Sequence, residues 1–560
     1  MEFSKKKMAM LAALLVIMGS CGGGMGTGGT ATSEVTPVNT PSVVSERDEN
    51  GYYRWNATDR SAATFKDNPN NKSSITAQTG AGVIVGVLDV GFVRNRADRK
   101  NPSIENNMSE LLPSLTSSYV SGNDTAKDED HGIYVADAIG GKGNGIAPSV
   151  TIYARDISGT PYTDTEDNDK SKANPVYRKV DYDWLKSKNV KIYNQSFGED
   201  KGMDYYTESD YMDVFFPDID LLDFYNSEVE AGKLFVWAAG NKPPYSGPTL
   251  EAGLPYFEPA LEKGWLNVVG LTAQSESDLT AREFEWENIE VLSPAGKAAN
   301  WTVAVLGDKR YSPTGGKFSG EGNYIIMTGS SFAAPVVTGT PALLLQKYPW
   351  MDGSLLRQTI LSTATDVGAE GVDETFGWGV LNIDKAVKGP SQFLKTLALA
   401  DNVTVNVTTG VYTFSNDISG DAGIIKNGAG TLILSGNSSF TGGTTVNSGK
   451  LQVNGTYASG VSITPLGTFT TAEKAALSGS ITNDGTYENS TETVVNGNYT
   501  ATPSSRYVSN LGASMKVSGQ VELNDSKLSL TSLKDGEAQY ITAKGTETEI
   551  IKSDSGISGS

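Results

Sequence analysis

Short apolar, β-branched runs alternate with helical stretches from about residue 51 to residue 389, and this alternation stops abruptly near residue 390. The apolar runs include "GVIVGVLDV" and "KLFVWAAG", and the helical stretches include "YVADAIGG" and "LLRQTILSTAT". Strands that alternate with helices in this way are typical of βαβ units around a buried, mostly parallel sheet. We therefore expect residues 51–389 to form one α/β domain.

Residues 390–560 have a different pattern, in which short alternating strands are separated by Gly, Asn and Asp. In "IIKNGAGTLILSGNSSFTGGTTVNSGKLQVNG", residues 424–455, three such strands follow one another. This pattern predicts the stacked rungs of a parallel β-helix, or β-solenoid, in which each strand pairs with the rungs on either side. A generic β-sandwich of short strands is the alternative that the pattern leaves open.

The N-terminus has the form of an export signal. Three lysines precede an apolar run from Met8 to Met18, which is too short to span a bilayer but suits a signal peptide. The single cysteine, Cys21, follows in "MGSCGGG", which looks like a bacterial lipobox whose cysteine becomes lipid-modified; an incidental cysteine near an ordinary cleavage site is the alternative. We interpret residues 1–21 as the signal and residues 22–50, rich in Gly, Thr, Ser and Pro, as a flexible tether.

Net charge and cysteine content limit which partners the chain can bind and how its fold can be stabilised. The formal net charge of -20 argues against nucleic-acid binding, which needs basic patches. A lone cysteine forms no internal disulfide, so an exported fold must depend on its core or on metal ions. The acidic stretch from Thr163 to Asn174 is a candidate for structural Ca²⁺. It lacks the alternating acidic spacing and fixed glycine of a calcium loop, so we interpret it as a solvated insertion and assign no metal and no cofactor.

Four polar residues stand at expected strand ends or helix starts, where open α/β sheets gather their ligands and catalytic groups. Asp89 ends the run "VIVGVLD", His131 opens a helical stretch, Asn241 follows "KLFVWAAG", and Ser331 precedes "FAAP". Taken singly, the aspartate and asparagine fit ordinary turns and the serine fits a helix cap. Their chain order, however, is the subtilisin order of acid, base, oxyanion donor and nucleophile.

The strings around these residues resemble those of the subtilases, S8-type serine endopeptidases. The matching strings are "VLDVGF", "HGIYVADAIGG", "AAGN" and "GSSFAAP", and the resemblance extends from about Val83 to Val387. It implies a subtilisin-like fold, a mostly parallel sheet flanked by helices. It also implies catalysis by Asp89, His131 and Ser331, with the Asn241 amide and the Ser331 N–H as oxyanion donors.

Two further positions follow from the same resemblance. The segment Ser196, Phe197 and Gly198 matches the family segment that pairs with the substrate as an added strand, and Ser330 takes the place usually held by threonine. Val90 departs from the family pattern, because it replaces the usual Thr or Ser after the aspartate and so removes a hydroxyl.

The 424–455 stretch resembles the passenger-associated repeat of bacterial autotransporters. Together with the subtilase motifs, it implies a protease exported to the outer membrane or cell surface, or released from it. The tail ending "IIKSDSGISGS" shows no pattern of membrane-barrel strands. We therefore expect the sequence to be a fragment, with membrane attachment through a lipid anchor or a C-terminal barrel that is not included.

The expected function is thus a surface-exposed or secreted serine endopeptidase acting on polypeptides, with its own chain among the candidate substrates. The alternative is a catalytically inactive, subtilase-like adhesin with a β-helical stalk. The presence of all four polar residues favours the enzyme. Substrate preference and oligomeric state are not readable from the sequence.

Overall fold

The computed structural model describes residues 53–54, 78–92, 120–121, 131–141, 145–157, 179–198, 202–207, 219–241, 247–273, 289–311, 325–531, 533–534, 537–538 and 549–559. The predicted signal peptide, the tether, Cys21 and the acidic stretch 163–174 lie outside these residues.

Within the described residues, nine strands form a twisted sheet in the order β1-β8-β7-β6-β5-β2-β4-β3, and β9 pairs with β7. Strands β2 to β7 and β9 run parallel to their neighbours, whereas β8 is antiparallel to both β7 and β1. The strands are β1 (Tyr53–Arg54), β2 (Ile84–Asp89), β3 (Val120–Ser121), β4 (Thr151–Asp156), β5 (Ile192–Gln195), β6 (Leu234–Ala238), β7 (Trp265–Ala273), β8 (Ile289–Val291) and β9 (Thr302–Leu306). The predicted mostly parallel α/β sheet is confirmed.

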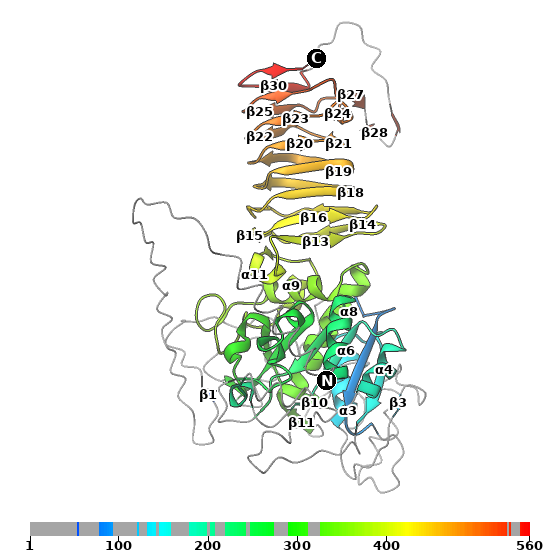
Figure 1. Ribbon diagram of the computed structural model, residues 1–560, viewed down its shortest axis with the longest axis vertical. Coiled ribbons are helices and arrows are strands. Elements are labelled where there is room, and N and C mark those ends of the chain that lie inside the picture. The colour runs from blue at the N-terminus through cyan, green and yellow to red at the C-terminus, as the bar shows by residue number, and fades with distance from the viewer. Residues whose placement is uncertain are drawn as a thin grey trace, which may run out of the picture. The chain divides into compact units, whose positions relative to one another are not determined.

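Helices cover both faces of this sheet (Figure 1), because its strands carry apolar side chains on both sides. In β2, Val85 and Val87 belong to the core shared with α3 (His131–Gly140) and α8 (Ser330–Lys347). Leu88 packs into the second core, which is rich in aromatic rings and includes side chains of α4 (Lys179–Lys186) and α6 (Ile219–Glu230). Among the described residues, the other elements of this part of the chain are α9 (Gly353–Thr363), α10 (Ile383–Ala386), η4 (Met203–Tyr205), η6 (Leu254–Tyr256), η7 (Pro259–Gly264), η9 (Gly296–Trp301), and the antiparallel pair of β10 (Asp308–Tyr311) with β11 (Ile325–Thr328).

Helix α8 is buried on nearly all sides, which explains why it carries no charged residue before Lys347. Its first turn begins directly over the sheet at Gly270 of β7. A Cβ at Gly270 would come within 2.8 Å of the Ser330 Cα, so only glycine allows the helix start to approach the strand this closely. The sheet thereby fixes the position of the first turn of α8.

The C-terminal residues form a β-solenoid, whose strands are stacked one above another in Figure 1. Sixteen described strands belong to one sheet, and every pairing within it is parallel. The solenoid strands, with the short β12–β15 pair beside them, are β12 (Gln392–Phe393), β13 (Asn402–Asn406), β14 (Val411–Phe414), β15 (Ser419–Gly420), β16 (Gly423–Asn427), β17 (Thr431–Leu434), β18 (Thr444–Tyr457), β19 (Val461–Leu477), β20 (Ile481–Asn483), β21 (Thr486–Asn489), β22 (Thr493–Val495), β23 (Tyr499–Ala501), β24 (Arg506–Asn510), β25 (Met515–Val517), β26 (Val521–Glu522), β27 (Lys527–Thr531), β30 (Ile551–Ser553) and β31 (Ile557–Ser558). Parallel pairing between successive rungs is the β-helical arrangement predicted from the sequence, rather than the β-sandwich.

An aromatic ladder runs through the interior of the solenoid. Phe440, Tyr457, Phe469, Tyr487 and Tyr507 are buried, and each ring contacts the next with centroid separations between 5.4 and 6.1 Å. Such contacts are in the range for favourable ring pairs. The rungs are therefore held together by side-chain stacking as well as by backbone hydrogen bonds.

The first rungs of the solenoid pack against the end of α8. The rings of Tyr348 and Phe414 lie 5.3 Å apart, and Trp350 contacts both Phe414 and Tyr412. The Tyr348 hydroxyl donates to the carbonyl of Thr413 at 2.9 Å.

Among the described residues, no helix is long and apolar enough to cross a membrane.

Candidate active site

A carboxylate and an imidazole meet at the carboxyl edge of the sheet. Asp89 is the last residue of β2 and is 1% exposed, whereas His131 is the first residue of α3, with about a quarter of its side chain exposed (27%). The His131 Nδ1 lies 2.6 Å from the Asp89 Oδ1, which also accepts the Val90 N–H at 2.7 Å. A carboxylate at Nδ1 keeps a proton on that nitrogen and makes Nε2 the basic atom of the neutral ring.

The first turn of α3 is fixed to the end of β2, and this holds the imidazole beside the carboxylate. The Gly132 N–H donates to the Val90 carbonyl at 2.7 Å. A Cβ at Gly132 would come within 2.5 Å of the Phe92 ring, so glycine is needed for this approach. The Asp89 Oδ2 is buried and has no hydrogen-bond partner among the described residues, and Val90 offers it no hydroxyl.

Ser331 lies in the first turn of α8, on the side of the sheet that carries α3. Its hydroxyl donates to the Ser196 carbonyl at 3.1 Å. The ring of the next residue, Phe332, packs against the His131 ring with centroids 5.3 Å apart. The residue after Ser331 thus contacts the imidazole, and Ser331 itself lies at a helix N-terminus whose N–H groups and dipole favour negative charge.

Asn241 and Ser330 join the end of β6 to the start of α8. The Ser330 hydroxyl accepts the Gly240 N–H at 3.0 Å, and the Ser330 N–H donates to the Asn241 Oδ1 at 2.7 Å. Because a backbone N–H only donates, this contact assigns the amide oxygen of Asn241 to the helix side. The Nδ2 is then the donor end of the amide, and it lies beside Gly329, 3.3 Å from the position that a Cβ would take on that residue.

A buried network of hydrogen bonds stabilises the segment that carries Ser196. Asn194 of β5 donates through Nδ2 to the Ser196 hydroxyl at 3.0 Å, and its Oδ1 accepts the Thr338 hydroxyl at 2.8 Å. All three residues are buried. Since Thr338 lies on α8, the same helix contacts this segment twice, once through Ser331 at its start and once through Thr338 two turns later.

Phe197 and Gly198 continue this segment toward β6. The Phe197 ring packs edge-on against Trp237 of β6, with centroids 5.7 Å apart. A Cβ on Gly198 would lie 2.8 Å from the side chain of Thr249, so no larger residue fits here without a shift. The carbonyl of Ser196 therefore lies next to Ser331, and Gly198 is packed closely against Thr249.

No cluster that could hold a metal ion occurs in the described part of the chain, when groups of three or more His, Cys, Asp or Glu side chains are sought. The Thr163–Asn174 stretch, the candidate for Ca²⁺, is not among these residues.

One protein family matches the larger part of this chain. The model of the subtilase family matches residues 80–379, which is more than half of the 560 residues. The chain belongs to the subtilase family. A second model, the passenger-associated-transport-repeat, matches residues 424–453 within the solenoid.

The names of two relatives of this subtilase describe exported bacterial proteins. The neisserial autotransporter lipoprotein NalP of Neisseria meningitidis serogroup B is 38% identical over 259 residues, covering 45% of this chain and 23% of that protein. An extracellular serine protease of Serratia marcescens is 31% identical over 303 residues, covering 45% of this chain and 28% of the relative. The chain thus matches less than a third of the length of these two relatives. Among solved structures, fervidolysin of Fervidobacterium pennivorans is 21% identical, covering 56% of this chain and 43% of that chain, with a TM-score of 0.36.

The structure of this subtilase brings the predicted site residues together in three contacts: Asp89 with His131, Ser331 with Ser196, and Asn241 with Ser330. The Asn194–Thr338 hydrogen bond was not predicted from the sequence. Ser330 was expected only to replace threonine, whereas its hydroxyl also accepts the Gly240 N–H. Asn194 is two residues before Ser196, an expected site residue, but nothing in the helix sequence indicates Thr338 as its partner.

Proposed function

We propose that this subtilase is a serine endopeptidase in which Ser331 is the nucleophile and His131 the general base. The observation that carries the proposal is the 2.6 Å contact between Asp89 and His131, with Ser331 one residue from the phenylalanine that packs on the imidazole. A serine hydroxyl is a weak nucleophile until a neighbouring base takes its proton.

In the first step, the Ser331 hydroxyl turns from the Ser196 carbonyl to His131 Nε2 and loses its proton to it as the oxygen attacks the scissile carbonyl. The imidazolium that forms is stabilised by the buried Asp89 carboxylate, which stays ionised. His131 then gives the proton to the leaving amine, and the acyl group remains on Ser331. In the second half, water attacks the ester by the same proton transfers in reverse order.

The developing oxyanion would be bound by the Asn241 Nδ2 and the Ser331 N–H. Both lie at the N-terminus of α8, where partial positive charge already exists before the reaction and needs no reorganisation. Ser196, Phe197 and Gly198 would receive the substrate backbone as an added strand, a mode in which main-chain hydrogen bonds supply affinity.

We further propose export to the cell surface or the extracellular space, with polypeptides as substrates and self-processing among the reactions. The names of the relatives, an autotransporter lipoprotein and an extracellular protease, support export. The position of Cys21 after the apolar N-terminal run supports a lipid anchor at that residue. Mass analysis of the N-terminus of the native protein, after extraction in detergent, would detect the acyl groups.

Labelling with a fluorophosphonate tests the catalytic proposal. We expect the wild-type chain to be labelled at Ser331, and Ser331→Ala and His131→Ala to be unlabelled while remaining folded by circular dichroism. The chain contains one histidine, so no second imidazole can replace His131. Persistent labelling of His131→Ala would therefore rule out the mechanism, and an unlabelled, folded wild type would favour the inactive adhesin.

A further inference from the structure

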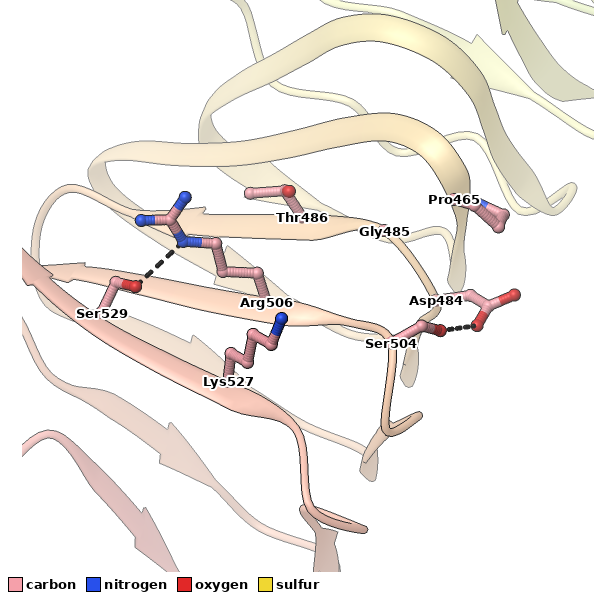
Figure 2. A pocket seen from close by; sticks show the side chains of 8 residues that line it. All are labelled: Pro465, Asp484, Gly485, Thr486, Ser504, Arg506, Lys527 and Ser529. Carbon is pink, nitrogen blue, oxygen red and sulfur yellow. Dashed lines mark hydrogen bonds between the residues drawn. The ribbon is translucent and has the colours of Figure 1, made fainter.

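An open polar groove lies on the outer face of the solenoid, away from the residues of the proposed active site. Its volume is about 470 Å³. Figure 2 shows Arg506 and Lys527 on neighbouring strands, with Asp484 and Ser504 together near the turn that precedes them. The groove is lined by Pro465, Asp484, Gly485, Thr486, Ser504, Arg506, Lys527 and Ser529.

The two cations of the groove face each other across adjacent rungs. Arg506 of β24 is in register with Lys527 of β27 on one side and with Thr486 of β21 on the other. Like charges directly opposite each other on neighbouring strands destabilise a sheet. Within the described residues, neither cation has an ion pair with a carboxylate, and the Arg506 Nε donates to the Ser529 hydroxyl at 2.9 Å.

Two other cations of the solenoid are paired with carboxylates, whereas Arg506 and Lys527 lack such a partner among the described residues although the chain has a net charge of -20. Lys450 is paired with Glu488 at 2.7 Å, and Lys516 is paired with Glu492. Glu488 also lies on the face of β21 that carries Thr486, but it is held by Lys450 and by the Thr470 hydroxyl at 2.9 Å. The positive charge of Arg506 and Lys527 is therefore not neutralised by that carboxylate.

The other end of the groove carries a carboxylate, that of Asp484, instead of cations. The Asp484 Oδ1 accepts the hydroxyls of Thr502 at 2.5 Å and Ser504 at 3.3 Å, and within the described part of the chain this carboxylate forms no ion pair with a cation. A carboxylate with spare lone pairs accepts hydrogen bonds from hydroxyl groups and repels a plain anion. A ligand that fits the whole groove must carry an anionic group at one end and hydroxyl donors at the other.

We propose that this groove binds an acidic saccharide. Its carboxylate or sulfate group lies between Arg506 and Lys527, and its ring hydroxyls donate to Asp484 and exchange hydrogen bonds with Ser504 and Thr486. An anion bridging the two cations removes their mutual repulsion, and charge-assisted hydrogen bonds to arginine and lysine supply most of the affinity. The solenoid would thereby hold the protease against a surface that displays such sugars.

The test is isothermal titration of the full chain with four probes: a galacturonate trisaccharide, a sulfated heparin disaccharide, a neutral galactose trisaccharide and inorganic sulfate. We expect one or both acidic sugars to bind and the neutral sugar not to bind. Binding of the galacturonate trisaccharide, which carries no sulfate, shows that a carboxylate suffices, and binding of the heparin disaccharide alone shows that a sulfate group is needed. Binding should weaken with increasing salt, because both cations are exposed. Failure of both acidic sugars to bind, or equal binding of the neutral one, would overturn the proposal.

Matched variants locate the site. Arg506→Gln with Lys527→Gln should weaken binding of the acidic sugar about tenfold or more, as expected for loss of hydrogen bonds from charged groups. Lys516→Gln with Lys552→Gln removes the same charge from other solenoid strands and should leave binding within about twofold, since long-range effects of exposed charges are screened. Equal weakening by both double variants would contradict a specific site.

Asp484→Asn separates a saccharide from a simple anion by the sign of its effect. If ring hydroxyls donate to Asp484, the variant weakens binding of the acidic sugar. If the groove holds only an anion, the variant strengthens binding of both the sugar and inorganic sulfate, because it removes a repulsive charge. Stronger binding in Asp484→Asn would therefore overturn the saccharide assignment. Fluorophosphonate labelling of each variant reports that the chain is still folded.

Discussion

The side-chain amide of Asn241 has an acceptor atom, Oδ1, and a donor atom, Nδ2, and the proposed mechanism uses the two atoms differently. Its Oδ1 accepts the Ser330 N–H at 2.7 Å, which ties the end of β6 to the first turn of α8. Its Nδ2 lies beside Gly329, the residue that precedes α8, and in the proposed mechanism this nitrogen would donate to the oxyanion. The same side chain would thus align the nucleophile's helix and donate to the transition state, and a single substitution by alanine would remove both contributions.

Asparagine-to-aspartate substitution at this position separates the two roles. Asn241→Asp keeps an oxygen that accepts the Ser330 N–H but replaces the donor by a negative charge facing the oxyanion. We expect kcat/KM on a peptide substrate to fall by at least ~10²–10³, as for loss of an oxyanion donor, with little change in the free energy of unfolding. Asn241→Ala should lose similar activity and, in addition, about 1 kcal/mol of stability from the lost hydrogen bond. An active Asn241→Asp enzyme would exclude Asn241 as an oxyanion donor.

At the scale of the elements, local patterns could predict where each strand and helix of the site ends, but not what holds those ends together. Asp89 and His131 were expected at a strand end and a helix start because apolar runs stop there. The Thr338–Asn194 hydrogen bond joins residues 144 positions apart, between a helix and a strand whose separate sequences carry no sign of it. Contacts of this kind are created by the packing of α8 on the sheet, which no local periodicity specifies.

In the solenoid, too, the local sequence predicted the strands but not the contacts between residues far apart in the chain. Its alternating strands and Gly or Asn turns predicted rungs, whereas Lys426 of β16 was not expected to be buried at an inward position beside Ile424. Its Nζ donates to the carbonyls of Asn427, Gly428 and Ser448 at 2.9 to 3.0 Å. Burial lowers the pKa of Lys426 to about 8, and the three acceptors satisfy an ammonium group that an apolar interior would exclude. Only the three-dimensional arrangement of neighbouring turns supplies them.

Helix α8 carries a matched pair of buried threonines that tests the network behind Ser196. Thr338→Val keeps the shape but leaves the Asn194 Oδ1 without its donor, so we expect a loss of ~1–3 kcal/mol of stability and a several-fold fall in kcat. Thr340→Val is the control, because the Thr340 hydroxyl donates only to the Val336 carbonyl of its own helix, at 3.3 Å. Thr338→Ser should restore kcat. Equal effects of the two valine substitutions would show that Asn194 does not depend on Thr338.

Across the whole molecule, a buried cation lies where the subtilase domain meets the solenoid. Arg357 of α9 is fully buried; it forms an ion pair with Glu262 of η7 and donates to the carbonyl of Leu397 at 2.9 Å. Leu397 lies in α11 (Lys395–Ala398), the short helix that precedes the first long solenoid strand. Burial lowers the pKa of Arg357 to about 10 while Glu262 opposes the shift, so the guanidinium remains charged at neutral pH. Arg357 therefore adds a polar link between the subtilase domain and the base of the solenoid to the aromatic contacts of Tyr348 and Trp350.

Breaking this link should destabilise both parts together. Arg357→Leu leaves Glu262 without its partner and the Leu397 carbonyl without its donor, so we expect a loss of ~3–5 kcal/mol, as for one member of a buried ion pair. The double variant Arg357→Leu with Glu262→Leu should recover part of that loss, because no unpaired charge remains. Thermal unfolding followed by both fluorophosphonate labelling of Ser331 and limited proteolysis of the solenoid measures each part separately. We expect the two midpoints to fall together in Arg357→Leu, since α9 and α11 belong to one continuous apolar core. A fall confined to the protease midpoint would mean that the solenoid folds independently of Arg357.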